Sequence, residues 1–293
     1  MRAVGRPLRR LVSGGPPWRR ARALLEEARG DEAHALLAEA IGAELREGAA
    51  AGTGWGLPLL TLELGKSFLK QTEAQDALDA FEHSVGLFEE AFFNRLPEDA
   101  DEAVHARYVE SLLHLAKLLS LAGQGDPEHH WKKAISHAMK HLGRDSYEIV
   151  VASLGVAEHA LEQLRLPEAE RYAAAAAEAA AALPPSPAAR ARRVEAIALL
   201  GVACAQRQDT EQAIEHYSEA LALLDEGSKG SDEGMLDSWT RAALHNLYRN
   251  MEHAHRARGD DEAAQAWKKR RDARLTELRD VVLEEQPTVR GKV

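Results

Sequence analysis

The amino-acid sequence predicts an all-α fold, and three observations support this prediction. Alanine and leucine dominate the 45% of apolar residues, aromatic residues make up only 5%, and runs of β-branched residues are few, which favours helices. Small and apolar residues recur at intervals of three and four, the spacing that places them on one face of a helix. The same spacing returns along the 293 residues, so we expect an array of related helix pairs.

The clearest pattern lies in residues 197–225, which are predicted to form two amphipathic helices. Gly201 lies on the first helix, and Ala213, Tyr217 and Ala220 follow on the second at intervals of four and three. These intervals place the three residues on one helical face. We expect Gly201 and Ala213 to lie where the two backbones approach most closely, with larger side chains around them.

This pattern resembles the tetratricopeptide repeat (TPR), a helix-turn-helix unit of about 34 residues that stacks into a superhelix. The resemblance implies an α-solenoid, a right-handed superhelix of five to six TPR-like helix pairs, over residues 18–285. Residues 144–183, with their Pro-Glu-Ala-Glu turn, are similar to the longer repeats of kinesin light chains. The resemblance also implies a binding protein, without naming its partner.

Further copies of the pattern support the repeat assignment. Gly65 is followed by Ala77, Phe81 and Ser84 at the expected spacing, and a degenerate copy occupies residues 33–40. The alanine that opens each copy, or the histidine that replaces it, is expected at Ala33, Ala77, His130, Ala169, Ala213 and Ala263. Successive positions are 39 to 53 residues apart, so longer helices or loops than the common repeat are expected.

Breaks in the pattern predict where the helices end. Gly48–Gly56 is expected to be a loop, and Pro184–Pro187 to end a helix, because proline lacks the amide hydrogen and clashes with the preceding turn. Gly227–Gly234 is expected to be a flexible link, in which Asp232 could cap the next helix. The last helix, extending to Glu285, is expected to cap the solenoid. Residues 286–293 are expected to be a disordered tail.

The N-terminal segment has a charge of its own. Residues 1–22 contain seven arginines and no acid. Because the whole chain has a net charge of −10, the remaining residues carry a net charge of −17. Residues 1–17 are typical of an organelle presequence, which predicts a transit peptide and a location on the matrix side of the mitochondrion, or in a plastid. The alternatives are a disordered basic tail or a misassigned start, and then a cytoplasmic protein.

Charge and composition also bear on the partners. An acidic body repels phosphate backbones, which argues against nucleic acid, although related helical repeats bind single-stranded RNA. No apolar run reaches the roughly 18 residues of a membrane span. The single cysteine, Cys204, excludes an internal disulfide and is expected to be buried and inert. The sequence predicts no nucleic acid partner and no membrane span.

The chemistry-bearing residues do not form a known catalytic pattern. The sequence contains no nucleophile elbow, HExxH, phosphate loop or GxGxxG after a strand, so we predict no enzyme and no cofactor. His137 and His141 have the i, i+4 spacing that can hold a metal from one helix, and His130 shares their face. No further ligand completes the set, so stacked or exposed histidines are the preferred interpretation and no metal is predicted.

The predicted function is that of a non-catalytic scaffold or assembly factor. In TPR proteins the first helices of the pairs line a groove that receives an extended peptide or a helix of a partner protein. The lysine-asparagine clamp of the chaperone-binding members is absent here. The candidate protein-binding residues on the first helices are Lys66, Lys70, His245, Tyr248, Arg249 and Arg256. The alternative function is that of a structural subunit of a large, mitochondrial complex.

Overall fold

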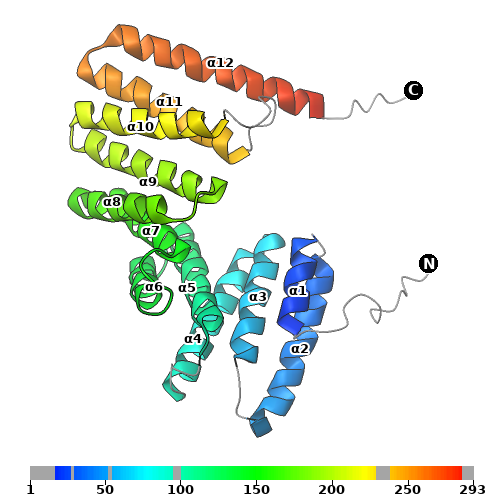
Figure 1. Ribbon diagram of the computed structural model, residues 1–293. Coiled ribbons are helices and arrows are strands. Elements are labelled where there is room, and N and C mark those ends of the chain that lie inside the picture. The colour runs from blue at the N-terminus through cyan, green and yellow to red at the C-terminus, as the bar shows by residue number, and fades with distance from the viewer. Residues whose placement is uncertain (1–16, 28–29, 52–54, 95–99, 229–237, 286–293) are drawn as a thin grey trace, which may run out of the picture. The chain divides into compact units, whose positions relative to one another are not determined.

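The computed structural model describes residues 17–27, 30–51, 55–94, 100–228 and 238–285. These residues form twelve α-helices and no strand, which confirms the all-α prediction. The helices are α1 (Pro17–Glu26), α2 (Gly30–Ala51), α3 (Gly56–Lys70), α4 (Ala74–Asn94), α5 (Glu102–Ala122), α6 (Pro127–His141), α7 (Tyr147–Glu162), α8 (Leu166–Ala182), α9 (Pro187–Gln206), α10 (Thr210–Ser228), α11 (Ser238–Arg258) and α12 (Asp261–Glu285) (Figure 1). The predictions for residues 1–16, Asp232 and residues 286–293 lie outside the described residues.

The chain divides into two compact units, an N-terminal unit (Met1–Gly143) and a C-terminal unit (Arg144–Val293). Each unit contains three helix pairs, which agrees with the predicted five to six pairs. In the N-terminal unit the pairs are α1/α2, α3/α4 and α5/α6, and in the C-terminal unit they are α7/α8, α9/α10 and α11/α12. The first helices of successive pairs also touch within each unit, α1 against α3 and α3 against α5, then α7 against α9 and α9 against α11.

In each of two helix pairs, a glycine of the first helix lies against an aromatic ring of the second helix. A Cβ atom added to Gly201 would lie 2.4 Å from Cε1 of Tyr217, and one added to Gly65 would lie 2.7 Å from Cε1 of Phe81. Real Cβ atoms do not approach carbon this closely, so both positions require glycine while the ring stays in place. Both rings are buried. The expectation that Tyr217 packs around Gly201 is therefore confirmed.

The second helices present the small residues that the pattern predicts. In α10 the buried residues include Ala213, Tyr217 and Ala220, and in α4 they include Ala77, Phe81 and Ser84. Helix α8 buries a stripe made entirely of alanine, at Ala169, Ala173, Ala176 and Ala180. Such a stripe lets the neighbouring helices approach closely. Each alanine buries little apolar area, however, so it contributes little hydrophobic stabilisation.

Two predicted signature positions are one residue out of register. In α6 the buried residues are Pro127, Trp131, Ala134 and Ala138, so His130 is not the substitute for a small core residue. In α12 it is Ala264 that is buried, whereas Ala263 is half-buried. Asp260 begins this second helix as Asp209 begins α10, since each accepts a backbone hydrogen bond from the residue four positions later. In α12 the aspartate therefore identifies the buried alanine four residues later, whereas in α6 the N-cap Asp126 lies four residues before His130 and does not identify the buried position.

The helices end at the proline run as predicted, but two other helices continue into segments whose glycines predicted loops. Helix α8 ends at Ala182 and α9 begins at Pro187, as the proline run predicts. Helix α2 continues to Ala51 and α10 to Ser228, into segments that were predicted to be loops. Glycine weakens a helix by about 1 kcal/mol, and neighbouring alanine or glutamate can offset this. Within the described residues, no helix is long and apolar enough to cross a membrane.

Candidate functional site

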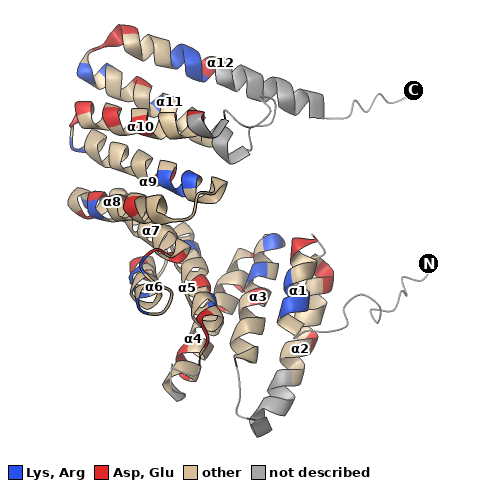
Figure 2. Cartoon of the chain, in the orientation of Figure 1, with Lys and Arg blue, Asp and Glu red and all other residues tan. Residues whose placement is uncertain are grey.

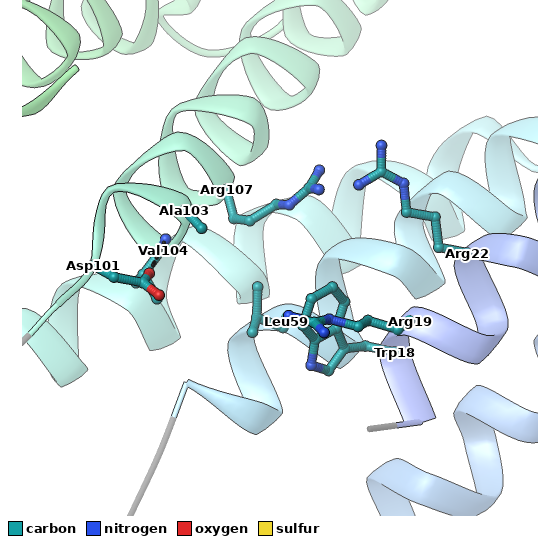
Figure 3. Close-up of a pocket in the computed structure, with 8 residues that line it drawn as sticks. All are labelled: Trp18, Arg19, Arg22, Leu59, Asp101, Ala103, Val104 and Arg107. Carbon is teal, nitrogen blue, oxygen red and sulfur yellow. Dashed lines mark hydrogen bonds between the residues drawn. The ribbon is translucent and has the colours of Figure 1, made fainter. Parts of the chain in front are cut away.

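A pocket on the first helices of the N-terminal unit is the candidate site. It has a volume of about 320 Å³ and lies where α1, α3 and the start of α5 meet (Figure 3). It is lined by Trp18, Arg19, Arg22, Leu59, Asp101, Ala103, Val104 and Arg107. The pocket combines an apolar surface with three guanidinium groups, so it offers contacts to an apolar group that carries a negative charge.

The apolar part of the pocket comes from three helices. Leu59 of α3 and Val104 of α5 are buried, and Trp18 of α1 is half-buried. Asp101 caps α5, because its Oδ1 accepts a hydrogen bond of 2.9 Å from the backbone N–H of Val104. The cap fixes the first turn of α5 and therefore the position of this wall of the pocket.

The three arginines of the pocket differ in what already binds them. The guanidinium of Arg19 lies over the ring of Trp18, 5.0 Å from its centre, and within the described residues Arg19 has no carboxylate partner. Arg22 Nε is 3.2 Å from Glu26 Oε1, and Arg107 Nη1 is 2.5 Å from Glu110 Oε2. Figure 3 shows Arg22 and Arg107 extending toward one another from α1 and α5. Arg19 is thus the guanidinium with most capacity for an anionic ligand.

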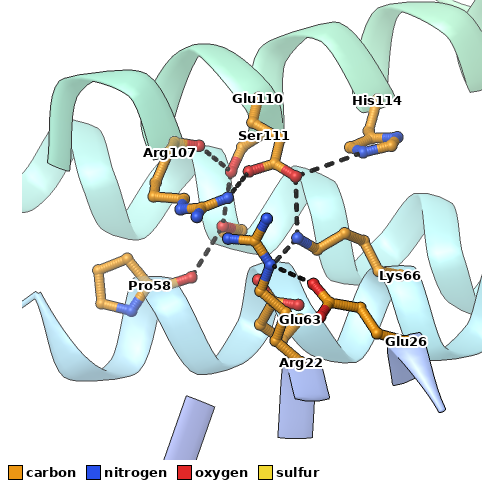
Figure 4. Close-up of polar contacts among 10 residues, drawn as sticks. Arg22, Glu26, Pro58, Glu63, Lys66, Arg107, Glu110, Ser111 and His114 are labelled. Atoms are coloured by element: carbon orange, nitrogen blue, oxygen red, sulfur yellow. Dashed lines mark hydrogen bonds and ion pairs between the residues drawn. The ribbon is translucent and has the colours of Figure 1, made fainter. Parts of the chain in front are cut away.

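A network of charged residues lies beside the pocket and joins α3 to α5 (Figure 4). Lys66 Nζ is 2.6 Å from Glu63 Oε1 and 2.8 Å from Glu110 Oε1. Only 17% of the Lys66 side chain and 1% of the Glu63 side chain are exposed. Among the described residues, neither carboxylate oxygen of Glu63 accepts a hydrogen bond, so Lys66 provides a charge contact and leaves the carboxylate partly unsatisfied.

The two carboxylates of this network have opposite pKa shifts. Burial raises the pKa of Glu63, and the attraction of Lys66 only partly opposes it. Burial also acts to raise the pKa of Glu110, but Lys66 and Arg107 together hold it below its ordinary value. Glu110 has two cations close by, whereas Glu63 makes an ion pair with Lys66 alone among the described residues. The number of close cations explains the difference.

The predicted binding residues of the N-terminal unit are already engaged. Lys66 belongs to the network above, and Lys70 donates a hydrogen bond through Nζ to the backbone oxygen of Leu25 in α1. Figure 2 shows basic residues on both α1 and α3. The two lysines link neighbouring first helices, and so they position the pocket without lining it.

The other four predicted residues lie on α11 of the C-terminal unit, at intervals that place them on one face of the helix. Arg249 is exposed, and Arg256 Nη2 is 2.7 Å from Glu252 Oε1. Tyr248 packs on Trp267 of α12, with ring centres 5.7 Å apart. His245 is half-buried, and its Nδ1 has no hydrogen-bond partner among the described residues. The four residues share one helical face, and binding by this face stays a prediction.

The sequence pattern missed Trp18, Arg19, Arg22 and Arg107. A signal was present in part, because Arg19 and Arg22 are three residues apart, which places both on one face of a helix. They entered the sequence interpretation only as part of the basic N-terminal charge. Their meeting with Arg107 depends on the packing of α1, α3 and α5, which no local spacing indicates.

Comparison with known proteins identifies the fold. No protein-family model matches the chain, and no curated protein sequence matches it. The solved structure of BtubC (BKLC) from P. vanneervenii is similar, with a TM-score of 0.64 and 17% identity over 90% of this chain and 96% of that one. A protein of Podosopora anserina with nearly identical TPR-like repeats, described as a kinesin light chain, has a TM-score of 0.54 and 17% identity over 74% of this chain and 94% of its own. The chain thus has the fold of TPR-like repeat proteins.

Proposed function

We propose that this chain, with its TPR-like helix-pair fold, is a non-catalytic scaffold that binds an extended acidic segment of a partner protein. The binding site is the pocket on α1, α3 and α5. The observation that carries the proposal is the convergence of Arg19, Arg22 and Arg107 on an apolar surface, in a chain whose net charge is −10. Exposed basic groups on an acidic protein select a partner of opposite charge.

The chemistry of the pocket indicates the features of the segment. Guanidinium groups bind carboxylates through two parallel hydrogen bonds, which gives them geometric specificity. The surface of Trp18, Leu59 and Val104 suits one apolar side chain between the carboxylates. Tryptophan and arginine are the residues that most often dominate the energy of an interface. The proposed ligand is therefore a leucine or similar residue flanked by aspartate or glutamate.

A binding measurement on the full chain tests this proposal. The probe is a short fluorescein-labelled peptide in which leucine is flanked by glutamates, compared with the same peptide carrying glutamines. We expect fluorescence anisotropy to show binding of the glutamate peptide that weakens with salt. Arg19→Gln with Arg22→Gln should lower the affinity by about tenfold or more, since hydrogen bonds to charged groups contribute about 1.5–3 kcal/mol each.

Two control variants distinguish this site from other basic residues. Arg190→Gln alters an exposed arginine of α9, and it should leave the affinity unchanged. Arg249→Gln tests the site predicted on α11. Equal binding of the two peptides, or a larger loss with Arg249→Gln than with the double variant, would contradict the proposal. Retention of a partner at fixed stoichiometry by all variants, in pull-downs from the cells of origin, would favour the permanent-subunit function instead.

The location that we propose is the matrix side of the mitochondrion. It is supported by the arginine-rich, acid-free segment that precedes α1. Mass spectrometry of the N-terminus of C-terminally tagged protein, isolated from its own cells, tests this. A chain that begins near Trp18 agrees with import and cleavage, whereas an intact Met1 on cytosolic protein contradicts them.

A further inference from the structure

Three histidines that do not line the pocket meet between α5 and α6 of the N-terminal unit. They are His105 of α5 and His137 and His141 of α6, and one ring nitrogen from each lies within 4.8 Å of the others. His105 Nδ1 and His137 Nε2 are 2.9 Å apart and share a hydrogen bond. The i, i+4 pair was evident in the sequence, but its third member is His105 and not His130.

Aromatic side chains hold two of these rings in place. His105 is buried, with 4% of its surface exposed, and it stacks on Phe92 with ring centres 5.2 Å apart and planes 2° apart. Tyr108 meets His137 edge-on, with ring centres 4.7 Å apart. The hydroxyl of Tyr108 donates a hydrogen bond of 3.1 Å to Glu89 Oε1. The positions of His105 and His137 are therefore set by packing before any ion binds.

The third ring has more freedom. His141 lies at the C-terminal end of α6 and is half-buried. It is stacked on His105, with ring centres 3.9 Å apart and planes 12° apart. A metal ion lies in the plane of each imidazole that binds it, so His141 must turn away from this parallel arrangement to share an ion with His105. Its place at the helix end permits this rotation.

The environment selects the class of ion. The three residues offer only imidazole nitrogens as ligand atoms, and Lys133 and Lys140 lie close enough to act on His137. A neutral imidazole is the form that binds a metal. Neutral nitrogen ligands beside two lysines do not suit Mg²⁺ or Ca²⁺, which prefer charged oxygen ligands. They suit divalent ions with high affinity for imidazole, such as Zn²⁺, Ni²⁺ and Cu²⁺.

We propose that His105, His137 and His141 bind one divalent transition-metal ion of this imidazole-preferring class. Separations of 2.9 to 4.8 Å between the nitrogens are close to the roughly 3.3 Å expected for a tetrahedral ion with bonds of about 2.0 Å. The three rings leave the fourth position to water. The bound ion joins α5 to α6 and stabilises the N-terminal unit.

Metal titration of the purified full chain, stripped with a chelator, tests the proposal. Zn²⁺ is titrated in competition with a chromophoric chelator, and Co²⁺ is added separately because its visible absorption reports the coordination geometry. We expect one ion per chain, intense absorption typical of a tetrahedral site, and a melting temperature that rises with Zn²⁺. His137→Ala should weaken Zn²⁺ binding by at least about tenfold, which corresponds to about 1.4 kcal/mol.

Matched variants make each outcome decisive. His83→Ala removes an exposed histidine of α4 and should leave both affinity and absorption unchanged. His141→Ala, at the half-exposed helix end, provides the test if His137→Ala fails to fold, and it too should weaken Zn²⁺ binding by about tenfold. The proposal is wrong if the stripped chain binds no Zn²⁺, or if His141→Ala and His83→Ala bind it as the unaltered chain does.

Discussion

The two units differ in how they hold a buried carboxylate. In the N-terminal unit Glu63 has one cation within ion-pair distance among the described residues, Lys66, and no hydrogen bond. In the C-terminal unit Glu252, also buried, is bound by Arg256 at 2.7 Å and by Arg271 of α12 at 2.5 Å. Both units use the same helix pairs. The comparison shows that the fold accommodates buried charge, and that the number of cations decides how well each carboxylate is compensated.

Both units also bury polar side chains between their helices. The N-terminal unit buries Ser67, Ser84 and Ser111 as well as His105, and Ser84 Oγ is 3.1 Å from Ser111 Oγ. The C-terminal unit buries Ser146, Ser153 and His255 as well as Glu252, beside the alanine stripe of α8. Polar packing therefore occurs in both units.

The largest expected effect comes from removing the cation of the less well compensated carboxylate. Lys66→Met leaves Glu63 buried without its ion pair, and breaking a buried pair in this way costs about 3–5 kcal/mol. Arg256→Met should cost less, because Glu252 keeps Arg271. Chemical denaturation of both variants measures the difference. Adding Glu63→Gln to Lys66→Met should restore part of the stability, and no restoration would show that the loss is not electrostatic.

The next largest expected effect concerns the glycine beneath an aromatic ring, which both units contain. Gly201→Ala and Gly65→Ala each place a methyl group against a buried ring, and overpacking of this kind typically costs 1–3 kcal/mol. Gly86→Ala is the control, because a Cβ there meets nothing within 4 Å and alanine favours the helix by up to about 1 kcal/mol. Thermal unfolding should rank Gly86→Ala above the unaltered chain and the other two below it. An unchanged melting temperature for Gly201→Ala would refute the steric argument.

A smaller expected effect is that the stability of the N-terminal unit depends on pH. Burial lowers the pKa of His114 and of His130 in the N-terminal unit. The attraction of Glu110 raises the pKa of His114, and the repulsion of Lys66 lowers it further. For His130, the cations His129 and Lys133 also lower the pKa, and the anions Glu89 and Asp126 raise it. These histidines take up protons near pH 6.5 in the unfolded chain and only at lower pH in the folded chain. Their contribution to the free energy of unfolding is therefore largest above about pH 6.5 and decreases as the pH falls below it.

Hydrogen exchange of the full chain measures this difference. Between pH 7.5 and 5.5, after correction for intrinsic rates, α5 and α6 should lose protection, and His114→Gln should reduce the loss. Glu63 has a raised pKa and acts in the opposite direction, gaining stability as the pH falls toward its folded pKa. Equal protection of α5 and α6 at both pH values would contradict the prediction.

The smallest effect concerns helix caps. Asp126 Oδ1 accepts a 3.0 Å hydrogen bond from the backbone of His129 in the N-terminal unit, and Ser186 Oγ accepts one of 3.1 Å from Ala189 in the C-terminal unit. Replacing either residue by alanine should cost about 1 kcal/mol. Ser146 occupies the same position before α7 but its side chain makes no capping bond, so Ser146→Ala should cost less in the same denaturation experiment.

The sequence predicted the fold through contacts between neighbours along the chain. Gly201 and Tyr217 are close in sequence, so their spacing already contained the packing that the structure confirms. The register of α6 and α12 was harder, because His130 and Ala263 fit the spacing as well as their neighbours do. The pocket and the histidine cluster were not predicted as sites, since each requires residues from helices far apart in sequence, such as Arg19 with Arg107 and His105 with His137.

The glycine beneath an aromatic ring has a consequence for how such chains diverge. At Gly65 and Gly201 any side chain is costly while the facing ring keeps its position, whereas at most other positions of a helix pair only size or polarity is constrained. A lineage can therefore replace most of its residues and keep the same backbone, provided that the glycine and the ring persist or change together.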